Sequence, residues 1–396
     1  MKNRTLVIAP QPFFSPRGTP FSVYYRTMIS AELGRKMDFL TYGQGSDVEI
    51  PEVRFFRTPA FRFLGPVKIG PSPLKLFHDV FIFFAMIVLL VRNRYECVHA
   101  HEEAVFMALF LKPIFRFRLI YDMHSSLPQQ LDNFKFNRFK PLIALFTWLE
   151  NKSLAASDAV ITICPDLYNY VQTVLPGNQK NYLIENSIFE PVHLKNQPAV
   201  FDGDDSLPRP IPDSFVHRVV YAGTLESYQG IDILIQAMGR IAGTHRHSGL
   251  GCIIVGGTPD QVARYRSLAR DCGAEKQILF TGRIAQQQAR AYNSRATVLV
   301  SPRSSGTNTP LKIYEQLASG IPLVATNIYS HTQVLTPEIA FLVEPEPEDM
   351  ARGILEAVAD REKARQLAVK AKKLYDDHYS RNAYVEKLAK VFERVG

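Results

Sequence analysis

Short runs rich in Val, Ile and Leu alternate with longer segments of helical period along almost the whole chain. The runs of the first half lie at residues 6–9, 38–42, 53–57, 97–101, 119–123, 159–164 and 182–185. Those of the second half lie at residues 219–223, 252–256, 278–282, 298–301, 323–325 and 341–343. Near-continuous apolar strands separated by helices are typical of parallel sheets that are covered on both faces. The pattern therefore predicts a doubly wound α/β domain in each half.

The length of the chain and a proline-rich segment predict where the two domains meet. A chain of 396 residues exceeds what a single core normally holds. The prolines between the two halves are Pro191, Pro198, Pro208, Pro210 and Pro212. We expect a first domain at 1–195, a linker at 196–215 and a second domain at 216–377, with a terminal helix at about 378–396 packed back on the first domain. Two such domains would enclose a cleft at the carboxyl ends of their strands, where we expect the chemistry.

The charge of the chain narrows the classes of partner. A formal net charge of +8 favours polyanions, anionic lipid or phosphorylated substrates. Basic residues of the first half are interleaved with Phe and Leu, at Arg62, Lys68, Lys75, Arg92, Arg94, Lys112, Arg116, Arg118, Lys135, Arg138 and Lys140. The sequence has no zinc-finger spacing and no recognition-helix signature, so we expect a membrane-surface or acceptor face rather than nucleic-acid binding.

Cysteine usage and apolar runs predict the compartment. The cysteines Cys97, Cys164, Cys252 and Cys272 are scattered and form no CxxC pair, which indicates a reducing compartment such as the cytoplasm. The first residues pass directly into a short strand, so we expect no export signal. The longest apolar run, residues 77–91, contains His78 and Asp79 and is shorter than a bilayer requires. A buried or interfacial helix is favoured there over a membrane span.

Residues 297–326 read as a strand, a loop rich in Ser, Gly and Thr, a short helix and a second strand. We expect Thr309 to cap the helix and Pro310 to be its first residue, so that free backbone N–H groups face the loop. Lys312 lies in the first turn, and Arg303 lies at the other side of the loop. Two cations beside the positive end of a helix dipole favour a negatively charged ligand.

Glu315 lies one turn deeper in the same helix, at the edge of a face that we expect Leu311, Tyr314 and Ala318 to bury. A carboxylate there could accept hydrogen bonds from a vicinal diol. Phosphates at the helix N-terminus and a ribose at Glu315 together describe a nucleotide. The alternative is that Lys312 and Glu315 form an ordinary surface ion pair three residues apart.

Glycines end successive strands of the second half, at Gly223 followed by Thr224, at Gly256–Gly257, and at Gly282 followed by Arg283. Glycine at strand ends clears space for a flat base or a phosphate. In the first half, Gly18 ends the turn after the first strand and opens a helix, where backbone amides could approach a phosphate or a reacting sugar. A simple tight turn is the alternative for that segment.

Histidines of the first half follow two buried strands. His124 comes directly after one of them and could orient a substrate hydroxyl, or it could be a loop histidine hydrogen-bonded to backbone. His99, His101, Glu102 and Glu103 resemble part of a metal site, but no further ligand follows at zinc spacing, so we expect no metal. The Asp202–Gly203–Asp204 triplet lies in the polar linker and reads as solvated charge.

Several segments resemble the retaining GT-B glycosyltransferases of family 4, the glycosyl transferases of group 1. The segments are the Gly18 loop, YECVHAH, IYDMHSS, LENKSLAASDAVITIC, YAGTLESYQGIDILIQAM, IIVGG, ILFTGRI and SGTNTPLKIYEQLASGIPLVATN. The resemblance implies two Rossmann-like domains facing across an interdomain cleft. It also implies donor ribose binding by Glu315, the base at Gly282–Arg283, and the reaction centre at His124 and Gly18. By the same resemblance, the diphosphate and sugar would face Gly306, Thr307, Thr309 and Lys312. We also expect donor-binding roles for Gly223, Thr224, Gly256, Pro310 and Leu311.

The chain departs from that family at three positions. Thr307 stands where the first glutamate of the family's E-x7-E motif is expected, and Thr224 and Gln229 replace the usual Arg and Lys after the first strand of the donor domain. Arg303 and Lys312 are the candidates for the missing cations. Some branches of the family have GTNTPLK in place of the first glutamate, so an inactive enzyme is not implied.

The sequence therefore predicts a retaining, metal-independent glycosyltransferase that needs no cofactor beyond its nucleotide-diphosphate sugar. The expected acceptor is a glycan or a lipid-linked saccharide of surface polysaccharide or glycolipid synthesis, and the expected location is the cytoplasm, at the inner face of the cell membrane. Two alternatives use the same fold: a nucleotide-sugar epimerase or hydrolase, and a non-catalytic nucleotide-sugar-binding protein. The base, the sugar and the acceptor are not identified by the sequence.

Overall fold

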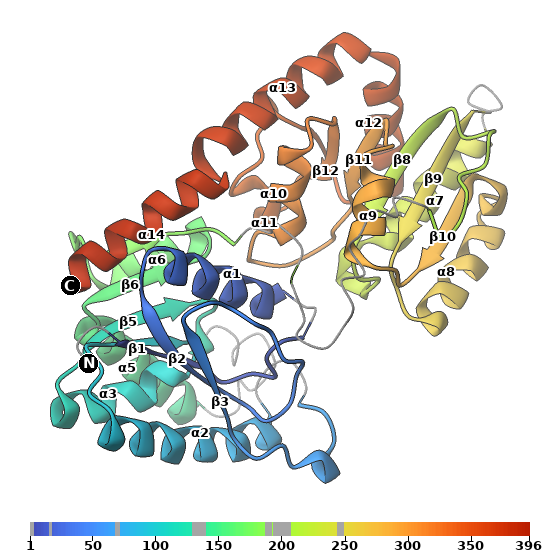
Figure 1. Cartoon of the computed structure of the whole chain (residues 1–396). Coiled ribbons are helices and arrows are strands. Elements are labelled where there is room, and N and C mark those ends of the chain that lie inside the picture. Colours follow the sequence, from blue (N-terminus) through green and yellow to red (C-terminus); the bar gives the residue numbers. More distant parts are fainter. Residues whose placement is uncertain are drawn as a thin grey trace. The chain divides into compact units, whose positions relative to one another are not determined.

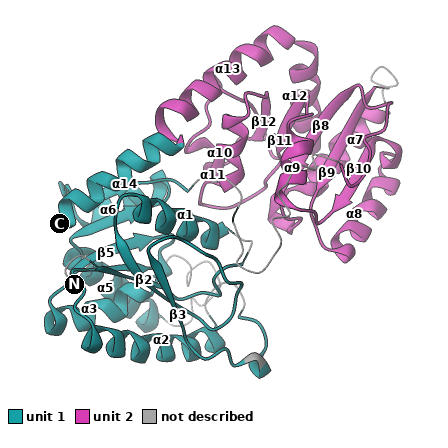
Figure 2. Cartoon of the chain, in the orientation of Figure 1, with its two compact units in different colours: residues 1–198, 381–396 teal, residues 199–380 magenta. Residues whose placement is uncertain are grey.

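The computed structural model describes residues 4–15, 18–67, 72–128, 140–186, 192, 207–243 and 249–396. The chain divides into two compact units, residues 1–198 with 381–396 and residues 199–380 (Figure 2). Most of the expected linker, residues 196–206 with the Asp202–Gly203–Asp204 triplet, lies outside the described residues.

Unit 1 is built on a seven-stranded parallel sheet with the order β3-β2-β1-β4-β5-β6-β7 (Figure 1). The strands are β1 (Arg4–Ala9), β2 (Lys36–Thr41), β3 (Val53–Arg57), β4 (Cys97–His101), β5 (Arg118–Met123), β6 (Ala159–Thr162) and β7 (Asn181–Leu183). Side chains alternate between the two faces of the sheet, so Leu6 and Ile8 enter one core while Val7 and Ala9 enter another.

Helices cover both faces of this sheet. They are α1 (Gly18–Glu32), η1 (Arg62–Leu64), α2 (Pro73–Arg92), α3 (Ala104–Phe115), α5 (Lys140–Ala156), α6 (Pro165–Val174) and α14 (Arg381–Val395). Buried residues of α2, α3, α5 and α6 share one core, and those of α1 and α14 pack on the opposite face. The C-terminal helix α14 places Tyr384, Leu388 and Val391 against Ile120 and Ile161 of the first unit's sheet.

Capping residues in the sequence fix where α2 begins. Its first turn is fixed by Ser72, whose hydroxyl accepts a hydrogen bond from the Lys75 backbone N–H, and by Pro73 at the first helical position. Of the helices among the described residues, α2 alone is long and apolar enough to cross a membrane by length and composition. In the structure one side of α2 packs on the sheet, with Ile82 and Met86 fully buried.

Unit 2 is built on a six-stranded parallel sheet with the order β10-β9-β8-β11-β12-β13. The strands are β8 (His217–Ala222), β9 (Leu250–Val255), β10 (Ile278–Gly282), β11 (Val298–Ser301), β12 (Leu323–Thr326) and β13 (Phe341–Val343). The other elements are η2 (Ser227–Gln229), α7 (Ile231–Ala242), α8 (Pro259–Asp271), η3 (Glu275–Gln277), α9 (Gln286–Asn293), α10 (Leu311–Ala318), α11 (Tyr329–Thr332), α12 (Pro347–Ala359) and α13 (Arg361–His378).

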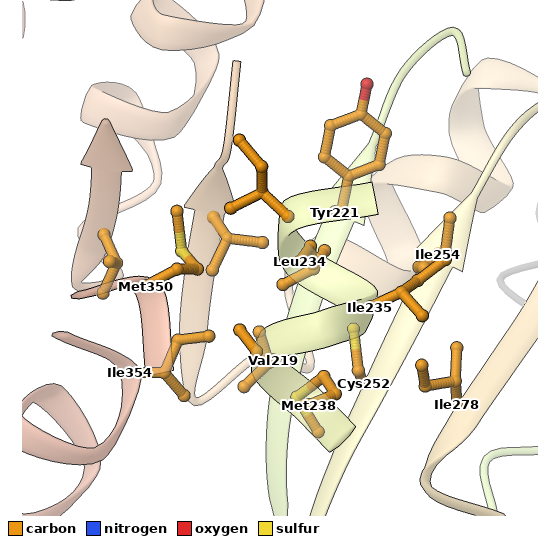
Figure 3. Packing of buried hydrophobic residues seen from close by; sticks show 14 of the residues in the cluster. Val219, Tyr221, Leu234, Ile235, Met238, Cys252, Ile254, Ile278, Met350 and Ile354 are labelled. Carbon is orange, nitrogen blue, oxygen red and sulfur yellow. The ribbon is translucent and has the colours of Figure 1, made fainter. Parts of the chain in front are cut away.

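The larger core of unit 2 lies between its sheet and the helices α7, α8 and α12. Figure 3 shows Leu234 and Met238 of α7 packed over strands β8 and β9, beside Ile354 of α12. Complete burial of an aliphatic side chain of this size stabilises the fold by about 1.5–3 kcal/mol. The helical spacing of these residues is the reason that α7 lies flat on the sheet.

Each sheet has one point where the chain order reverses. In unit 1 it lies between β1 and β4, and in unit 2 between β8 and β11. Ligands of open α/β sheets bind at the carboxyl ends of the strands beside such a switch point. The fold thus selects the segments after Ala9 and His101 in unit 1, and those after Ala222 and Ser301 in unit 2. That the two units face each other across a cleft stays a prediction.

Candidate functional site

In unit 2 the loop between β11 and α10 is organised around Arg303. Its Nε donates a 2.6 Å hydrogen bond to the Ser305 carbonyl, and Nη1 donates one of 3.4 Å to the Asn308 carbonyl. Gly306 has a φ of 130°, and a Cβ there would lie 2.0 Å from Nη2 of Arg303. The loop therefore closes over the guanidinium and requires a glycine at position 306. Burial lowers the pKa of Arg303.

Hydrogen bonds and ring contacts join this loop to the segment that follows β8. The Ser304 backbone N–H donates to the Tyr228 carbonyl over 3.0 Å. The guanidinium of Arg303 lies 5.3 Å from the centroid of the Tyr228 ring, a cation–π contact. The two segments that flank the switch point are thus held together.

Lys312 in the first turn of α10 points to the end of β8. Its Nζ donates a 2.8 Å hydrogen bond to Oε1 of Gln229 and lies 4.2 Å from the centroid of the Tyr221 ring. A Cβ built on Gly223 would lie 3.7 Å from the same Nζ. Burial, together with the charge of Arg303, lowers the pKa of Lys312 to about 7. No carboxylate of the described residues forms an ion pair with Lys312, so its charge lacks a counter-ion within this part of the chain.

The expectation that Thr309 caps α10 is wrong. The helix begins at Leu311, and its N-cap is Pro310 with φ −67° and ψ 138°, an extended conformation. Because the proline lies before the helix rather than in it, Thr309 is one residue too far away to cap. Its Oγ1 is buried and has no hydrogen-bond partner among the described residues, so it is free to contact a ligand.

Thr307 and Glu315, the two positions of the family motif, have different surroundings. Thr307 is exposed in the loop, and its carbonyl accepts a hydrogen bond from Gln333. The Glu315 side chain is 29% exposed and has its Oε1 3.5 Å from Nη2 of Arg290 on α9. Burial raises the pKa of Glu315 against the opposing charge of Arg290. A surface pair between Lys312 and Glu315 is not formed, because each contacts a different partner.

The buried face of α10 also differs from the expected one. It consists of Ile313, Tyr314, Gln316 and Leu317, whereas the predicted members Leu311 and Ala318 are only partly covered. The Gln316 side chain donates to the Val300 carbonyl over 3.2 Å. Glu315 lies at the edge of this face, so its carboxylate reaches partly out of the core.

His331 of α11 is a buried residue of this site that the sequence reasoning missed. One ring nitrogen lies 3.0 Å from Ser301 Oγ at the end of β11, and the other lies 2.9 Å from the carbonyl of Thr326 at the end of β12. Burial lowers its pKa to about 4, so His331 is neutral and positions the strand ends beneath the loop. The signal in the sequence that could have identified this residue is a histidine five residues after Thr326, the polar residue at the end of a strand.

Some strand-end glycines of unit 2 allow two backbone segments to approach closely, and others leave open space beside the strand. A Cβ on Gly256 would lie 1.9 Å from the Gly223 carbonyl oxygen, and the Gly256 N–H donates to the Gly282 carbonyl over 3.0 Å. Gly282 faces open space, and Arg283 beside it is exposed. Thr224 accepts a hydrogen bond from the Tyr221 hydroxyl through its carbonyl, at 2.6 Å.

In unit 1, Gly18 begins α1 after the β1 turn, and it is exposed. His124 belongs to a buried cluster at the ends of β4 and β5. Its Nε2 lies 3.2 Å from Nδ1 of His101 and 3.3 Å from Oδ1 of Asp122. His124 therefore contacts side chains of the neighbouring strands, which the alternative of a simple backbone-bonded loop histidine did not predict.

The cluster is neutralised by an arginine. Nε of Arg26 lies 3.0 Å from Oδ2 of Asp122, and Nε2 of His99 lies 3.0 Å from the same oxygen. Although burial opposes it, the charge of Arg26 holds the pKa of Asp122 well below its usual range, and burial lowers the pKa of His99 and His101. His99, His101 and Asp122 are close enough to share a cation. Because Arg26 already balances the carboxylate, the arrangement fits a buried ion pair better than a metal site.

Glu102 follows β4 in the left-handed region, with a φ of 52°. Its N–H donates to the Asp122 carbonyl over 3.1 Å, and its carboxylate accepts a 2.9 Å hydrogen bond from Ser125. Burial raises its pKa to about 7. Strained backbone of this kind is concentrated at functional sites. Glu102 lies at the switch point, whereas in the sequence it stands out only as part of the metal-like run from His99 to Glu103.

Two further acidic residues, Glu103 and Asp79, lie near Glu102 and connect this edge of the sheet to α2. Glu103 pairs with Lys75 at 2.5 Å, and the Tyr42 hydroxyl donates to Asp79 at 2.5 Å. Burial and the charge of Glu103 raise the pKa of Asp79 to about 7. Tyr42 and Asp79 lie on separate elements, so no sequence motif joined them.

Two Rossmann-like units, each built on a parallel sheet, are the architecture of the GT-B class of glycosyltransferases. The family model described as "Glycosyl transferases group 1" matches residues 216–374, and the one described as "Glycosyl transferase 4-like domain" matches residues 30–186. Together the two models span more than half of the chain, which belongs to the group 1, family 4-like glycosyltransferases.

Similar proteins agree with that assignment. YtcC of Bacillus subtilis, described as a "Putative glycosyltransferase", is 24% identical over 76% of this chain and 74% of its own length. The GDP-mannose-dependent alpha-(1-6)-phosphatidylinositol monomannoside mannosyltransferase of Mycobacterium tuberculosis is 32% identical over 28% of this chain and 29% of its own.

Solved structures share the fold. Sucrose-phosphate synthase from Thermosynechococcus elongatus has a TM-score of 0.76 at 19% identity, covering 100% of this chain and 99% of that one. HepE of Anabaena in complex with UDP has a TM-score of 0.68 at 14% identity, covering 99% and 100%.

Proposed function

We propose that this glycosyltransferase moves a sugar, with retention of configuration, from a nucleotide-diphosphate sugar bound on unit 2 to a glycan or lipid-linked acceptor bound on unit 1. The observation that carries the proposal is the Lys312 ammonium, which lies beside the start of α10 without a carboxylate partner in the described chain, one turn before Glu315. A largely covered cation without a counter-ion is unfavourable unless a ligand supplies the negative charge. The UDP bound to HepE supports a nucleotide ligand for this fold.

The donor diphosphate is proposed to bind Lys312 and the free backbone N–H groups at the start of α10, near Pro310 and Leu311. Arg303 supports the same position by shaping the loop, and its charge adds to the positive potential. The proposed contacts to the transferred sugar are Thr307 and Thr309, whose hydroxyl has no hydrogen-bond partner among the described residues.

The ribose is proposed to bind Glu315, and the base to bind beside Gly282 and Arg283. Arg290 holds the Glu315 carboxylate from one side and leaves it partly exposed, which suits acceptance of hydrogen bonds from two adjacent hydroxyls. Gly223, Thr224 and Gly256 would form the floor beneath the diphosphate.

Gln229 is proposed to position Lys312 as a substitute for the cations that the resemblance leads us to expect after the first strand of this domain. Its side-chain oxygen accepts from Lys312 and aims the ammonium at Gly223, so a cation from α10 reaches the place that the missing residues would occupy. A bound diphosphate would raise the pKa of Lys312 again, since an opposite charge favours the protonated form.

Catalysis in this proposal rests on stabilisation of the leaving diphosphate. Lys312, Arg303 and the dipole of α10 neutralise the charge that develops on it, so the proposal includes no resident metal or cofactor. The acceptor hydroxyl is proposed to approach Gly18, Glu102 and His124 at the switch point of unit 1. His124 is held by Asp122 and His101, which orients its ring.

The proposed setting is surface polysaccharide or glycolipid synthesis in the cytoplasm, at the inner face of the cell membrane. The name of the Mycobacterium tuberculosis relative describes a phosphatidylinositol mannoside as its acceptor, which supports a lipid-linked acceptor. Basic and aromatic residues interleaved in the first half agree with this setting.

Thermal-shift titration with nucleoside diphosphates and their sugars, followed by product analysis with and without acceptor, tests the proposal. A ligand present at 100 times its Kd stabilises the fold by about 2.7 kcal/mol. Lys312→Ala and Glu315→Ala should each lose this stabilisation and the transfer activity, and the exposed Lys373→Ala should retain both. Product from donor alone would indicate an epimerase or hydrolase. Saturable binding without turnover would indicate a non-catalytic nucleotide-sugar-binding protein.

A further inference from the structure

Helix α2 carries apolar side chains on its outer side as well as on the side that packs on the sheet. Its outward stripe recurs every three or four residues, which places it on one side of the helix. The exposed fractions are Leu76 65%, Val80 51%, Phe84 61%, Val88 45% and Val91 70%. A helix at the surface of a soluble domain normally has polar side chains on its outer side. An apolar stripe there indicates a surface that contacts an apolar partner.

The exposed apolar surface continues over two neighbouring helices. Helix α2 contacts α3, and α3 contacts α5. Buried residues of the three helices enter the same core, so the helices form one layer over one face of the sheet and their exposed side chains project from that layer. We call the following residues the apolar face: Leu76, Val80, Phe84, Val88, Val91, Phe110, Ile114, Leu145 and Trp148. Figure 1 shows the three helices on the same side of unit 1.

Most exposed charges beside the apolar face are basic, although the acidic residue Glu96, which follows α2, is also exposed. Within α2, α3 and α5 the acidic residues are Asp79 and Glu150, and both are buried. Exposed basic residues follow the ends of α2 and α3 or open α5, at Arg92, Arg94, Arg116 and Lys140. Lys68, Lys135 and Arg138 lie outside the described residues. Apolar side chains with cations at their margin are complementary to an anionic lipid surface.

The contacts of α2 argue against other occupants of the apolar face. A span across the bilayer would pull Ile82 and Met86, which are fully buried, out of the core. A second copy of the chain packed symmetrically would bring the marginal arginines of both copies together, which is unfavourable. Trp148, half exposed on α5, is a residue type that is enriched at the membrane–water boundary.

We propose that the apolar face inserts into the headgroup region of an anionic bilayer and that this contact delivers a lipid-linked acceptor to unit 1. The first turns of α2 also carry Lys75 and Asp79, which contact Glu103 and Tyr42 at the carboxyl edge of the sheet. One helix thus joins the lipid contact to the edge where Glu102 lies. The delivery of the acceptor rests on the proposed function, whereas the membrane contact does not.

Vesicle sedimentation tests the contact with four proteins: the unmodified chain, the double variant Phe84→Asp with Val88→Asp, the double variant Arg92→Glu with Arg116→Glu, and the control Val369→Asp. Val369 is 58% exposed on α13 of unit 2, outside the apolar face, so the control adds a charge to an equally exposed valine. The vesicles are phosphatidylcholine alone and phosphatidylcholine with phosphatidylglycerol. Circular dichroism and thermal unfolding without ligand show that each variant is folded, and the nucleoside-diphosphate thermal shift measures donor binding separately.

The unmodified chain and the control should sediment with the anionic vesicles and be released by alkaline carbonate. The aspartate variant should lose at least about tenfold in affinity, since two apolar side chains no longer leave water. The glutamate variant should lose affinity for anionic vesicles, and its residual binding should depend less on salt. The proposal would be overturned if the aspartate variant sedimented with anionic vesicles as strongly as the unmodified chain, or if carbonate did not release the bound protein. It would also be overturned if the unmodified chain bound no vesicles and instead formed a dimer that the aspartates separate. Vesicle binding without a nucleotide shift would instead count against the proposed function.

Discussion

Replacement of Lys312 by methionine should stabilise the ligand-free protein and abolish its response to nucleotide. Burial lowers the pKa of Lys312 from its usual 10.5 to about 7. That difference corresponds to about 4–5 kcal/mol between the charged and neutral forms. The methionine loses the hydrogen bond to Gln229 and the contact with the Tyr221 ring, which offsets about 1–3 kcal/mol of the gain. The expected net gain is about 1–4 kcal/mol, or about 2–16 °C in Tm for a domain of this size.

The same pKa shift of Lys312 sets the dependence of stability on pH. Below pH 7 Lys312 is protonated in both the folded and the unfolded chain, so the charged side chain lowers the free energy of unfolding by its full amount. Between pH 7 and 10.5 the folded chain releases the proton first, the unfolded chain binds more protons, and stability rises with pH. The rise should be present in the unmodified chain and in Lys373→Met, and smaller in Lys312→Met.

The assay for Lys312→Met is thermal or urea unfolding of the three proteins at several pH values, with and without a nucleoside diphosphate. Methionine should raise the ligand-free Tm and remove the nucleotide shift, while Lys373→Met should change neither. A lower ligand-free Tm in Lys312→Met, or a nucleotide shift of unchanged size, would refute the reasoning.

Three further predictions concern the two switch points. Glu315→Gln should weaken donor binding about 10-fold to 100-fold in calorimetry, because hydrogen bonds to a charged acceptor are lost; equal weakening in the exposed Glu393→Gln would contradict this. Gly306→Ala should lower the unfolding free energy by about 1–3 kcal/mol, because its Cβ would meet Arg303 and its φ is 130°; unchanged stability would show that the loop is not closed over Arg303. Glu102, whose pKa is about 7, should hold the acceptor as a carboxylate, so activity should rise with pH through 7. Glu102→Gln should remove that rise and leave donor affinity unchanged, and a retained rise would assign the titration elsewhere.

Much of the architecture was readable from the sequence because it depends on local pattern. Apolar runs bounded by polar residues predicted the strands, and the confirmed GT-B fold follows from their alternation with helices. The segment around Lys312 was recognisable because strand, loop, helix start and cation stand within one stretch of chain. The terminal helix expected at about 378–396 is α14, Arg381–Val395.

What the sequence did not reveal depends on neighbours that the fold supplies. The Glu315 partner Arg290 comes from α9, and the Lys312 partner Gln229 comes from η2, so neither pairing follows from a spacing in the sequence. The Thr309 error came from one torsion angle, since Pro310 is extended rather than helical. His331 was missed because its short helix has no apolar period.

The central claim is that a diphosphate binds at the start of α10 while Glu315 holds the attached ribose. A crystal structure with a bound nucleoside diphosphate tests it most directly. We predict phosphate oxygens within hydrogen-bonding distance of Lys312 Nζ and both ribose hydroxyls on the Glu315 carboxylate. A nucleotide bound elsewhere, or one that leaves Lys312 bonded only to Gln229, would contradict the account.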